Sequence, residues 1–351
     1  MLHNAVLQII IAGIAGIALT AYVLFGGADY GGGVWDLLAS GPRREKQREL
    51  IAHAIGPIWE ANHVWLILIV VLLFTCFPPA FAAIMTVLHI PITLLLIGIV
   101  LRGSAFTFRA YDATHSAVQE RWGMIFSIAS VLAPVLLGVI VGAIASNGVG
   151  AAMGTLGESG IEFVPVFITP WLNAFTLAVG VMTLVLVAFL AATYLTVEAA
   201  HDTELQNDFR RRAIEAGLVL PITAYAALLA AEPLAPRVQH MLLHSSLAGP
   251  IHFAAMIAGL GAIGALWTRR FRLARVAAGA LVVLIIWGWL FAQYPFLVPP
   301  TLTIFDAASP PATLRAFVAA IAVGALVLIP SLWYLYGVFR RSHQPAPETP
   351  H

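Results

Sequence analysis

Ionisable side chains within apolar stretches of the sequence are the first candidates for chemistry, because each costs roughly 2.5–3.5 kcal/mol to place in hydrocarbon. Asp29 follows one apolar run and is surrounded by glycines. Three polar residues, Glu60, Asn62 and His63, lie within about one helical turn at the start of another run. A carboxylate, an amide and an imidazole at this spacing can relay protons or hold a chain of water molecules. Arg102 ends a third run and could neutralise the acids.

Each of these residues also has a purely structural interpretation. Asp29 would be a solvated carboxylate at a helix terminus, and the turn that contains Glu60 would be a hydrogen-bonded cluster that holds two helices together. His63 could instead ligate a haem or a metal ion, although a single histidine on a helix is usually only a hydrogen-bonded polar residue. The residues alone leave all three interpretations open.

Composition decides what kind of structure must position these residues. Of 351 residues, 60% are hydrophobic and only 10% are charged, against about 25% charged in an ordinary soluble domain, and the mean hydropathy is +0.92. So few charges cannot cover a water-facing surface, which excludes a soluble enzyme, a disordered regulator and a nucleic-acid binder. The single cysteine, Cys76, excludes an internal disulfide, a c-type haem attachment site and a thiolate metal cage.

Apolar runs of about twenty residues predict membrane-spanning helices rather than the alternating strands of a barrel. We therefore expect an all-α polytopic membrane protein with nine transmembrane helices. Residues 1–340 would form a single integral membrane domain, and residues 341–351 a disordered tail. The nine expected spans are centred on residues 6–28, 57–77, 79–101, 123–145, 165–197, 213–232, 250–268, 275–296 and 313–339.

The basic residues alternate between loops as membrane topology requires. All but two of the 18 Lys and Arg fall in the tail or in the loops after the first, third, fifth and seventh spans, the exceptions being Arg237 and Arg315. Because cytoplasmic loops are the basic ones, we expect the N-terminus outside and the C-terminus in the cytoplasm. Asp29, Glu60 and Arg102 would then share one membrane depth near the cytoplasmic face.

Several motifs together resemble those of subunit II of the cytochrome bd-type quinol oxidases. Gly27-Ala28-Asp29-Tyr30-Gly31 is similar to the Gly-Phe-Asp-x-Gly turn that closes the first helix in that family. The segment from Trp59 to Trp65 is similar to its Trp-Asp/Glu-x-Asn-x-Val-Trp motif, and the segment from Leu101 to Arg109 to its Leu-Arg-Gly-x-Ala-Phe-x-Phe-Arg motif. Weaker likenesses are Phe77-Pro78-Pro79-Ala80-Phe81-Ala82, Tyr294-Pro295 and Leu302-Thr303-Ile304.

The resemblance implies a nine-helix subunit of a bacterial plasma (inner) membrane enzyme that oxidises quinol and reduces O₂ in the aerobic respiratory chain. Its larger partner, subunit I, would hold the b- and d-type haems and the quinol site. This chain would scaffold subunit I, contribute to cytoplasmic proton uptake and bind no haem itself, with His63 as a weak candidate ligand. It could hold a quinone or a lipid, and a small accessory membrane subunit could join the complex.

By position in the motifs, the resemblance assigns the proton pathway to Asp29, Glu60, Asn62 and His63. Asp29 would lie near the start of the path, and Glu60 would relay protons towards a haem in the partner. Arg102 would compensate charge. The other residues assigned to the structural motifs are Trp59, Trp65 and Arg109.

The sequence departs from the family pattern at two positions. Glu60 stands where many members have Asp, and Phe25 stands where some members carry another acid four residues before Asp29. His63, at a variable position, points to the branch called cyanide-insensitive oxidases.

Two other functions remain open. A proton- or ion-coupled secondary transporter could use Asp29, Glu60 and Arg102, although its site would be expected near the midplane. A self-sufficient haem oxidase would need more axial ligands than His63.

Overall fold

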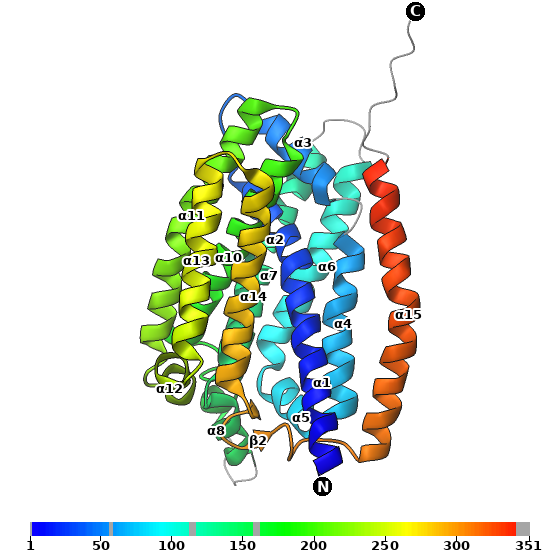
Figure 1. The fold of residues 1–351 in the computed structure, drawn as a ribbon, viewed down its shortest axis with the longest axis vertical. Helices are drawn as coiled ribbons and strands as arrows, with labels where there is room; N and C mark the ends of the chain where they lie inside the picture. Colours follow the sequence, from blue (N-terminus) through cyan, green and yellow to red (C-terminus); the bar gives the residue numbers. More distant parts are fainter. Residues whose placement is uncertain (1, 56–58, 112–116, 157–161, 342–351) are drawn as a thin grey trace, which may run out of the picture.

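The chain folds, in a computed structural model, into a bundle of long helices (Figure 1). The structure describes residues 2–55, 59–111, 117–156 and 162–341, and the side chains of these except residues 2–4, 59, 109–111, 117–120, 332 and 335–341. Within them, eight helices are long and apolar enough to cross a membrane, or nine if the bent pair α3–α4 is one span. The expected all-α polytopic fold is thereby confirmed, whereas the expected tail lies almost wholly outside the described residues.

The first span is longer than expected. Helix α1 (Leu2–Ala21) continues through a π-helical turn, η1 (Tyr22–Gly26), into α2 (Gly27–Leu37), so the prediction of a turn closing the helix near residue 28 was wrong. The glycines of α2 serve close packing instead. A Cβ atom on Gly31 would collide with the backbone of Val187, and one on Gly33 with Ser130. Small residues allow membrane helices to approach each other in this way.

The second and third spans are broken. Helices α3 (Arg44–Ile55) and α4 (Trp59–Cys76) meet at a bend of 53°. The expected single span over 79–101 is instead a ten-residue helix, α5 (Pro78–Val87), followed by α6 (His89–Tyr111). The prolines explain the break, since Pro78 and Pro79 favour a new helix start and Pro91 lies in the first turn of α6.

The fourth span agrees with its prediction, and the fifth begins later than predicted. Helix α7 (Ala117–Ala145) is followed by two short helices, α8 (Gly148–Thr155) and α9 (Phe163–Phe167), before α10 (Ala174–Glu198). The side chain of Asn173 accepts a hydrogen bond from the backbone of Thr176 at 3.1 Å, which caps α10 and fixes its start.

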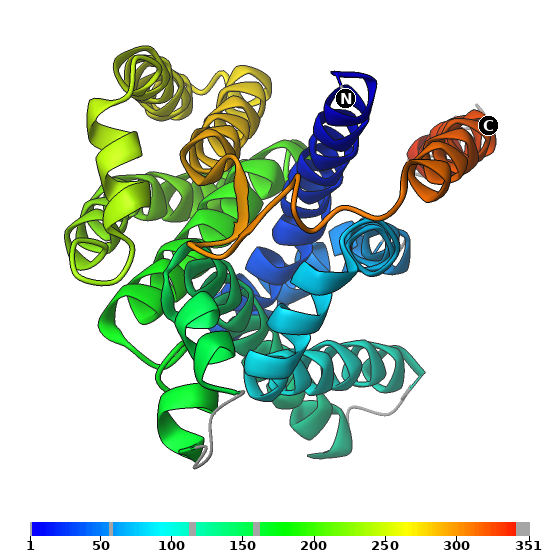
Figure 2. The same cartoon turned by 90° about the horizontal axis from the view of Figure 1, so that it is seen from below.

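The rest of the chain supplies four more spans, one short helix and a small hairpin. The helices are α11 (Thr203–Ala230), α12 (Pro236–His244), α13 (Ala248–Trp267), α14 (Phe271–Gln293) and α15 (Pro311–Arg341). Strands β1 (Phe296–Val298) and β2 (Leu302–Thr303) pair antiparallel between α14 and α15. Helix α15 stands at the edge of the bundle (Figure 2), and Leu326 is 76% exposed.

The two ends of the bundle differ in charge. Helix α3 lies at the end shown at the top of Figure 1, and α5, α8, α12 and β2 lie at the bottom, where α1 begins. We call the top the basic end, because α3 and the turn between α13 and α14 carry arginines there. Arg43 donates to Asp208 of α11 at 2.6 Å, and this carboxylate raises the pKa of Arg43 above its ordinary value.

Candidate functional site

A buried carboxylate lies between α2 and α4. Asp29 is 5% exposed, and Asn62 of α4 is 1% exposed and donates a hydrogen bond from its Nδ2 to Asp29 Oδ2 at 2.6 Å. Asp29 is the third residue after the π-helical turn, and such turns are frequent at functional sites. The structure therefore brings together two of the residues that the motifs assigned to the proton pathway.

Arg102 supplies the positive charge beside this carboxylate. It is 2% exposed, interacts electrostatically with Asp29, and donates from Nε to the hydroxyl of Ser130 on α7 at 3.1 Å. Its guanidinium carbon lies 4.9 Å from the ring centre of Tyr30. We call Asp29, Tyr30, Asn62, Arg102 and Ser130 the polar cluster. A buried arginine among these groups can neutralise Asp29 and hold four helices in one arrangement.

Two aromatic rings and His63 border the polar cluster. The hydroxyls of Tyr22 and Tyr30 share a hydrogen bond of 2.9 Å. The ring of His63 packs against both tyrosines, with centroid distances of 6.1 Å to Tyr22 and 6.4 Å to Tyr30. The part of the chain that the structure describes holds no group of three metal-ligating side chains.

Glu60 does not join the polar cluster. Its side chain is exposed, and among the described residues it makes no hydrogen bond or ion pair. Positions 60 and 62 of a helix point in nearly opposite directions, which is why Asn62 is buried while Glu60 faces outwards. Trp65 is half-buried against the core around α1 and α5. The side chains of Trp59 and Arg109 lie outside the described residues.

A second buried acid, Asp36, was missed in the sequence. It is 1% exposed and accepts a hydrogen bond from Ser127 of α7 at 2.9 Å. Arg48 of α3 donates from Nε to the backbone carbonyl of Asp36 at 3.3 Å, and the same nitrogen lies 4.0 Å from Asp36 Oδ2. The signal was present, because Asp36 follows Asp29 by seven residues and shares its helical face, but only if the helix continues past residue 28.

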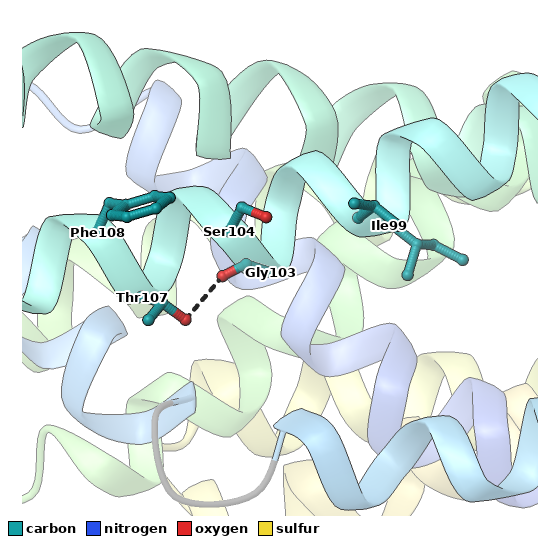
Figure 3. Close-up of a pocket in the computed structure, with 6 residues that line it drawn as sticks. Ile99, Gly103, Ser104, Thr107 and Phe108 are labelled. Carbon is teal, nitrogen blue, oxygen red and sulfur yellow. Dashed lines mark hydrogen bonds between the residues drawn. The ribbon is translucent and has the colours of Figure 1, made fainter.

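The Leu101–Arg109 motif divides between two faces of α6. Arg102 points into the bundle, whereas Gly103, Ser104 and Thr107 line a shallow hollow of about 430 Å³ on the outer surface (Figure 3). The hydroxyl of Thr107 donates to the Gly103 carbonyl at 3.0 Å, so the polar atoms of this hollow are partly satisfied within the helix.

An apolar cavity of about 630 Å³ lies on the other side of α2. Tyr22 and Tyr30 line it at its border with the polar cluster. Trp289 also lines it, and its buried Nε1 has no hydrogen-bond partner among the described residues. Most of the wall is aliphatic and comes from α7, α10, α11, α13 and α14, for example Leu137, Met182, Leu220, Met256 and Ile285.

Comparison with known proteins supports one family along nearly the whole chain. The family model for cytochrome bd terminal oxidase subunit II matches residues 7–339. A Bacillus subtilis protein provisionally named cytochrome bd menaquinol oxidase subunit II is 24% identical over 332 residues, which cover 91% of this chain and 92% of that protein. The cytochrome bd-I ubiquinol oxidase subunit 2 of Escherichia coli is 24% identical over 212 residues, which cover 59% of this chain and 53% of that protein.

The fold agrees with these sequence matches. A chain of the bd oxidase from Geobacillus thermodenitrificans superposes with a TM-score of 0.75 at 19% identity, covering 95% of this chain and 98% of that chain. None of these matches supports the transporter alternative. The chain belongs to the cytochrome bd terminal oxidase subunit II family, and is thus subunit II of a respiratory quinol oxidase.

Proposed function

We propose that this chain scaffolds the haem-bearing subunit I of the oxidase and delivers protons to it from the cytoplasm. The basic end would face the cytoplasm of a bacterial plasma membrane, with the N-terminus outside, in keeping with the distribution of Lys and Arg. The haems and the quinol site belong to subunit I in this proposal. The b- and d-type haems there supply the electron transfer to O₂, and the exposed apolar surface of α15 is compatible with a small accessory membrane subunit.

The observation that carries the proposal is the buried pair of Asp29 and Asn62. Reduction of O₂ to water consumes a proton for every electron, and these protons must cross the low-dielectric interior of the complex. Asp29 is held by an amide donor at 2.6 Å and balanced by the charge of Arg102, so its carboxylate can exist in the bundle and exchange a proton. A buried acid in such a setting is a functional candidate by default.

The expected order of residues follows from their exposure. Asp29 would receive the proton inside the bundle, and Asn62 and His63 lie on the next helix. Glu60, one turn away on the outer face of α4, would pass the proton to the partner subunit. Its exposure in the isolated chain is what a group that faces subunit I requires.

Two isosteric substitutions in the assembled complex test this pathway. We expect Asp29→Asn and Glu60→Gln each to lower quinol-driven oxygen uptake roughly a hundredfold, since a lost proton-transfer group typically has this effect, while haem content stays normal. Asp202→Asn, at the N-cap of α11, and Glu45→Gln, on the exposed face of α3, are the matched controls. Full activity of both test variants with normal haem content would disprove the pathway, and loss of haem would make the residues structural.

The apolar cavity is the second part of the proposal. Its volume and aliphatic wall suit the tail of an isoprenoid quinone or an acyl chain of a lipid. Ala224 of α11 lines the cavity, whereas Ala226 is exposed on the same helix. We expect Ala224→Phe to reduce the quinone or phospholipid that co-purifies with the complex, and Ala226→Phe to leave it unchanged, as measured by solvent extraction and mass spectrometry. Equal amounts in the two variants would argue against an occupied cavity.

A further inference from the structure

Three arginines in the turn between α13 and α14 have no partner in the part of the chain that the structure describes. Arg269, Arg270 and Arg272 are exposed, and their side chains make no hydrogen bond or ion pair with a described residue. The two helices cannot supply an acidic partner, because the sequence contains no Asp or Glu between Glu232 and Asp306. The turn therefore presents three positive charges at the basic end (Figure 1) that no described carboxylate neutralises.

Neighbouring arginines differ, because each of them stabilises the fold. Arg210 of α11 donates from Nε to the carbonyl of Leu266 at 2.7 Å and so caps the end of α13. Arg275 of α14 pairs with Glu198 of α10 at 3.3 Å. These side chains connect helices, whereas the three arginines of the turn make no such contact with the described residues.

Arg269 also occupies a backbone position that favours glycine. It follows the C-cap residue Thr268 of α13, and its φ of 59° is left-handed. The N–H groups of Arg269 and of the next residue bond to the carbonyls of Leu266 and Ala265, at 3.3 and 2.8 Å, which is the pattern of a helix that ends at a glycine. In the turn before α3, the left-handed residue is a glycine, Gly41. An arginine costs conformational free energy at such a position, so the fold alone would favour glycine at 269 as well.

Exposed apolar side chains adjoin these arginines. Trp267 is 69% exposed, and Leu273 and Val276 of α14 are 52% and 69% exposed. Arginines beside apolar side chains, at the end of two helices long enough to cross a membrane, match the headgroup and the acyl chains of a phospholipid. Guanidinium groups bind phosphate oxygens in bidentate pairs. A zwitterionic lipid would also bring its own positive charge next to the arginines, so the charges favour an anionic lipid.

We propose that the turn between α13 and α14 binds the headgroup of an anionic phospholipid. The phosphate would contact Arg269, Arg270 and Arg272, and the acyl chains would lie along the exposed apolar side chains of α13 and α14. This site is distinct from the apolar cavity, since none of the three arginines lines that cavity. It is also independent of the proposed proton pathway, because no residue of the polar cluster takes part.

Counting the lipids that bind to the assembled complex tests the site. The complex is purified in detergent, delipidated, incubated with phosphatidylglycerol or phosphatidylcholine, and analysed intact by mass spectrometry. We expect the unsubstituted complex to bind at least one phosphatidylglycerol more than Arg269→Gln/Arg270→Gln/Arg272→Gln, with no such difference for phosphatidylcholine. Equal phosphatidylglycerol counts would overturn the proposal. The same difference for phosphatidylcholine would overturn the selectivity for an anionic lipid.

A charge-matched control separates the turn from the overall charge of the basic end. Arg44→Gln/Lys46→Gln/Arg211→Gln removes three exposed charges from α3 and α11 and should bind as much phosphatidylglycerol as the unsubstituted complex. A loss as large as that of the test variant would overturn the site.

If the test variant does not assemble, Arg269→Gly replaces it, because glycine suits the left-handed backbone. Arg269→Gly should keep or raise the haem-loss temperature of the delipidated complex and lower its affinity for phosphatidylglycerol about fivefold. A residue with a merely structural role would not change the affinity, so an unchanged affinity would overturn the proposal.

Discussion

The polar cluster and the apolar cavity share helix α2 and the ring of Tyr30, but they differ in the polarity of the side chains that form them. In the polar cluster, Asp29 and Arg102 are buried charges, and each depends on named partners within about 3 Å. In the cavity, the wall is aliphatic, and the hydroxyl of Thr183 is satisfied by the carbonyl one turn back in its own helix. One face of α2 therefore carries the buried charge of the polar cluster, and the other borders the apolar cavity.

This difference predicts how the two regions respond to substitution. When one member of a hydrogen-bonded network of buried charges is removed, the groups that remain stay buried without their partner. The protein then loses stability, because the desolvation cost of these groups is no longer offset. An apolar cavity that can bind or release a lipid-like molecule keeps its structure when its contents change. Substitutions that remove a hydrogen-bonding group from the polar cluster should therefore disturb assembly, whereas those in the cavity should change mainly what the complex binds.

The largest effect is expected for Arg102→Leu. It leaves Asp29 buried without a positive neighbour, and breaking a buried pair of charges in this way costs about 3–5 kcal/mol. We expect most of the complex to fail to assemble, measured as haem per purified protein. Arg44→Leu, an exposed arginine at the basic end, is the control and should assemble normally. Normal haem content and thermal stability of Arg102→Leu would show that the charges are not coupled.

An intermediate effect is expected where α2 touches α10, between the two regions. A Cβ atom at Gly31 would collide with the carbonyl of Val187, which belongs to the backbone and cannot rotate away. We expect Gly31→Ala to cost about 2–3 kcal/mol by overpacking and to lower the temperature at which the complex loses its haem. Gly13→Ala in α1, where a Cβ would meet nothing within 4 Å, should have no such effect. Equal stability of the two variants would contradict this close approach.

Hydropathy predicted the membrane helices because a helix that lies in lipid must have apolar side chains. It failed at α2, where the glycines of Gly31–Gly33 are poor helix formers in water but favour contact in a membrane bundle. The predicted end near residue 28 therefore placed Asp36 in a loop and hid its relation to Asp29. The break at Leu88 was missed because the segments on both sides of it are apolar overall, although Pro91 marks the first turn of α6.

The candidate site was only partly predictable for a similar reason. Asp29 and Asn62 were identified as polar residues in apolar segments, and the structure joins them. Glu60 was expected alongside them, although its spacing of two residues from Asn62 puts it on the other face of α4. Ser130 and Ser127 gave no signal, since a serine inside a membrane helix usually bonds to its own backbone. The cavity could not be predicted from the sequence, because its wall is formed by helices that are far apart in sequence.

The smallest effects compare a hydroxyl of the polar cluster with one of the cavity. Ser130→Ala removes the acceptor of the Arg102 Nε hydrogen bond in a site that is 0% exposed, so we expect a cost of about 1–2 kcal/mol. Thr183→Val removes a hydroxyl of the cavity wall that bonds only to Val179 O, 2.8 Å away in the same helix. That carbonyl keeps its helical partner, so the cost should stay below about 0.5 kcal/mol. The haem-loss temperature of the two variants measures the contrast, and equal shifts would mean that Ser130 does not hold Arg102 in place.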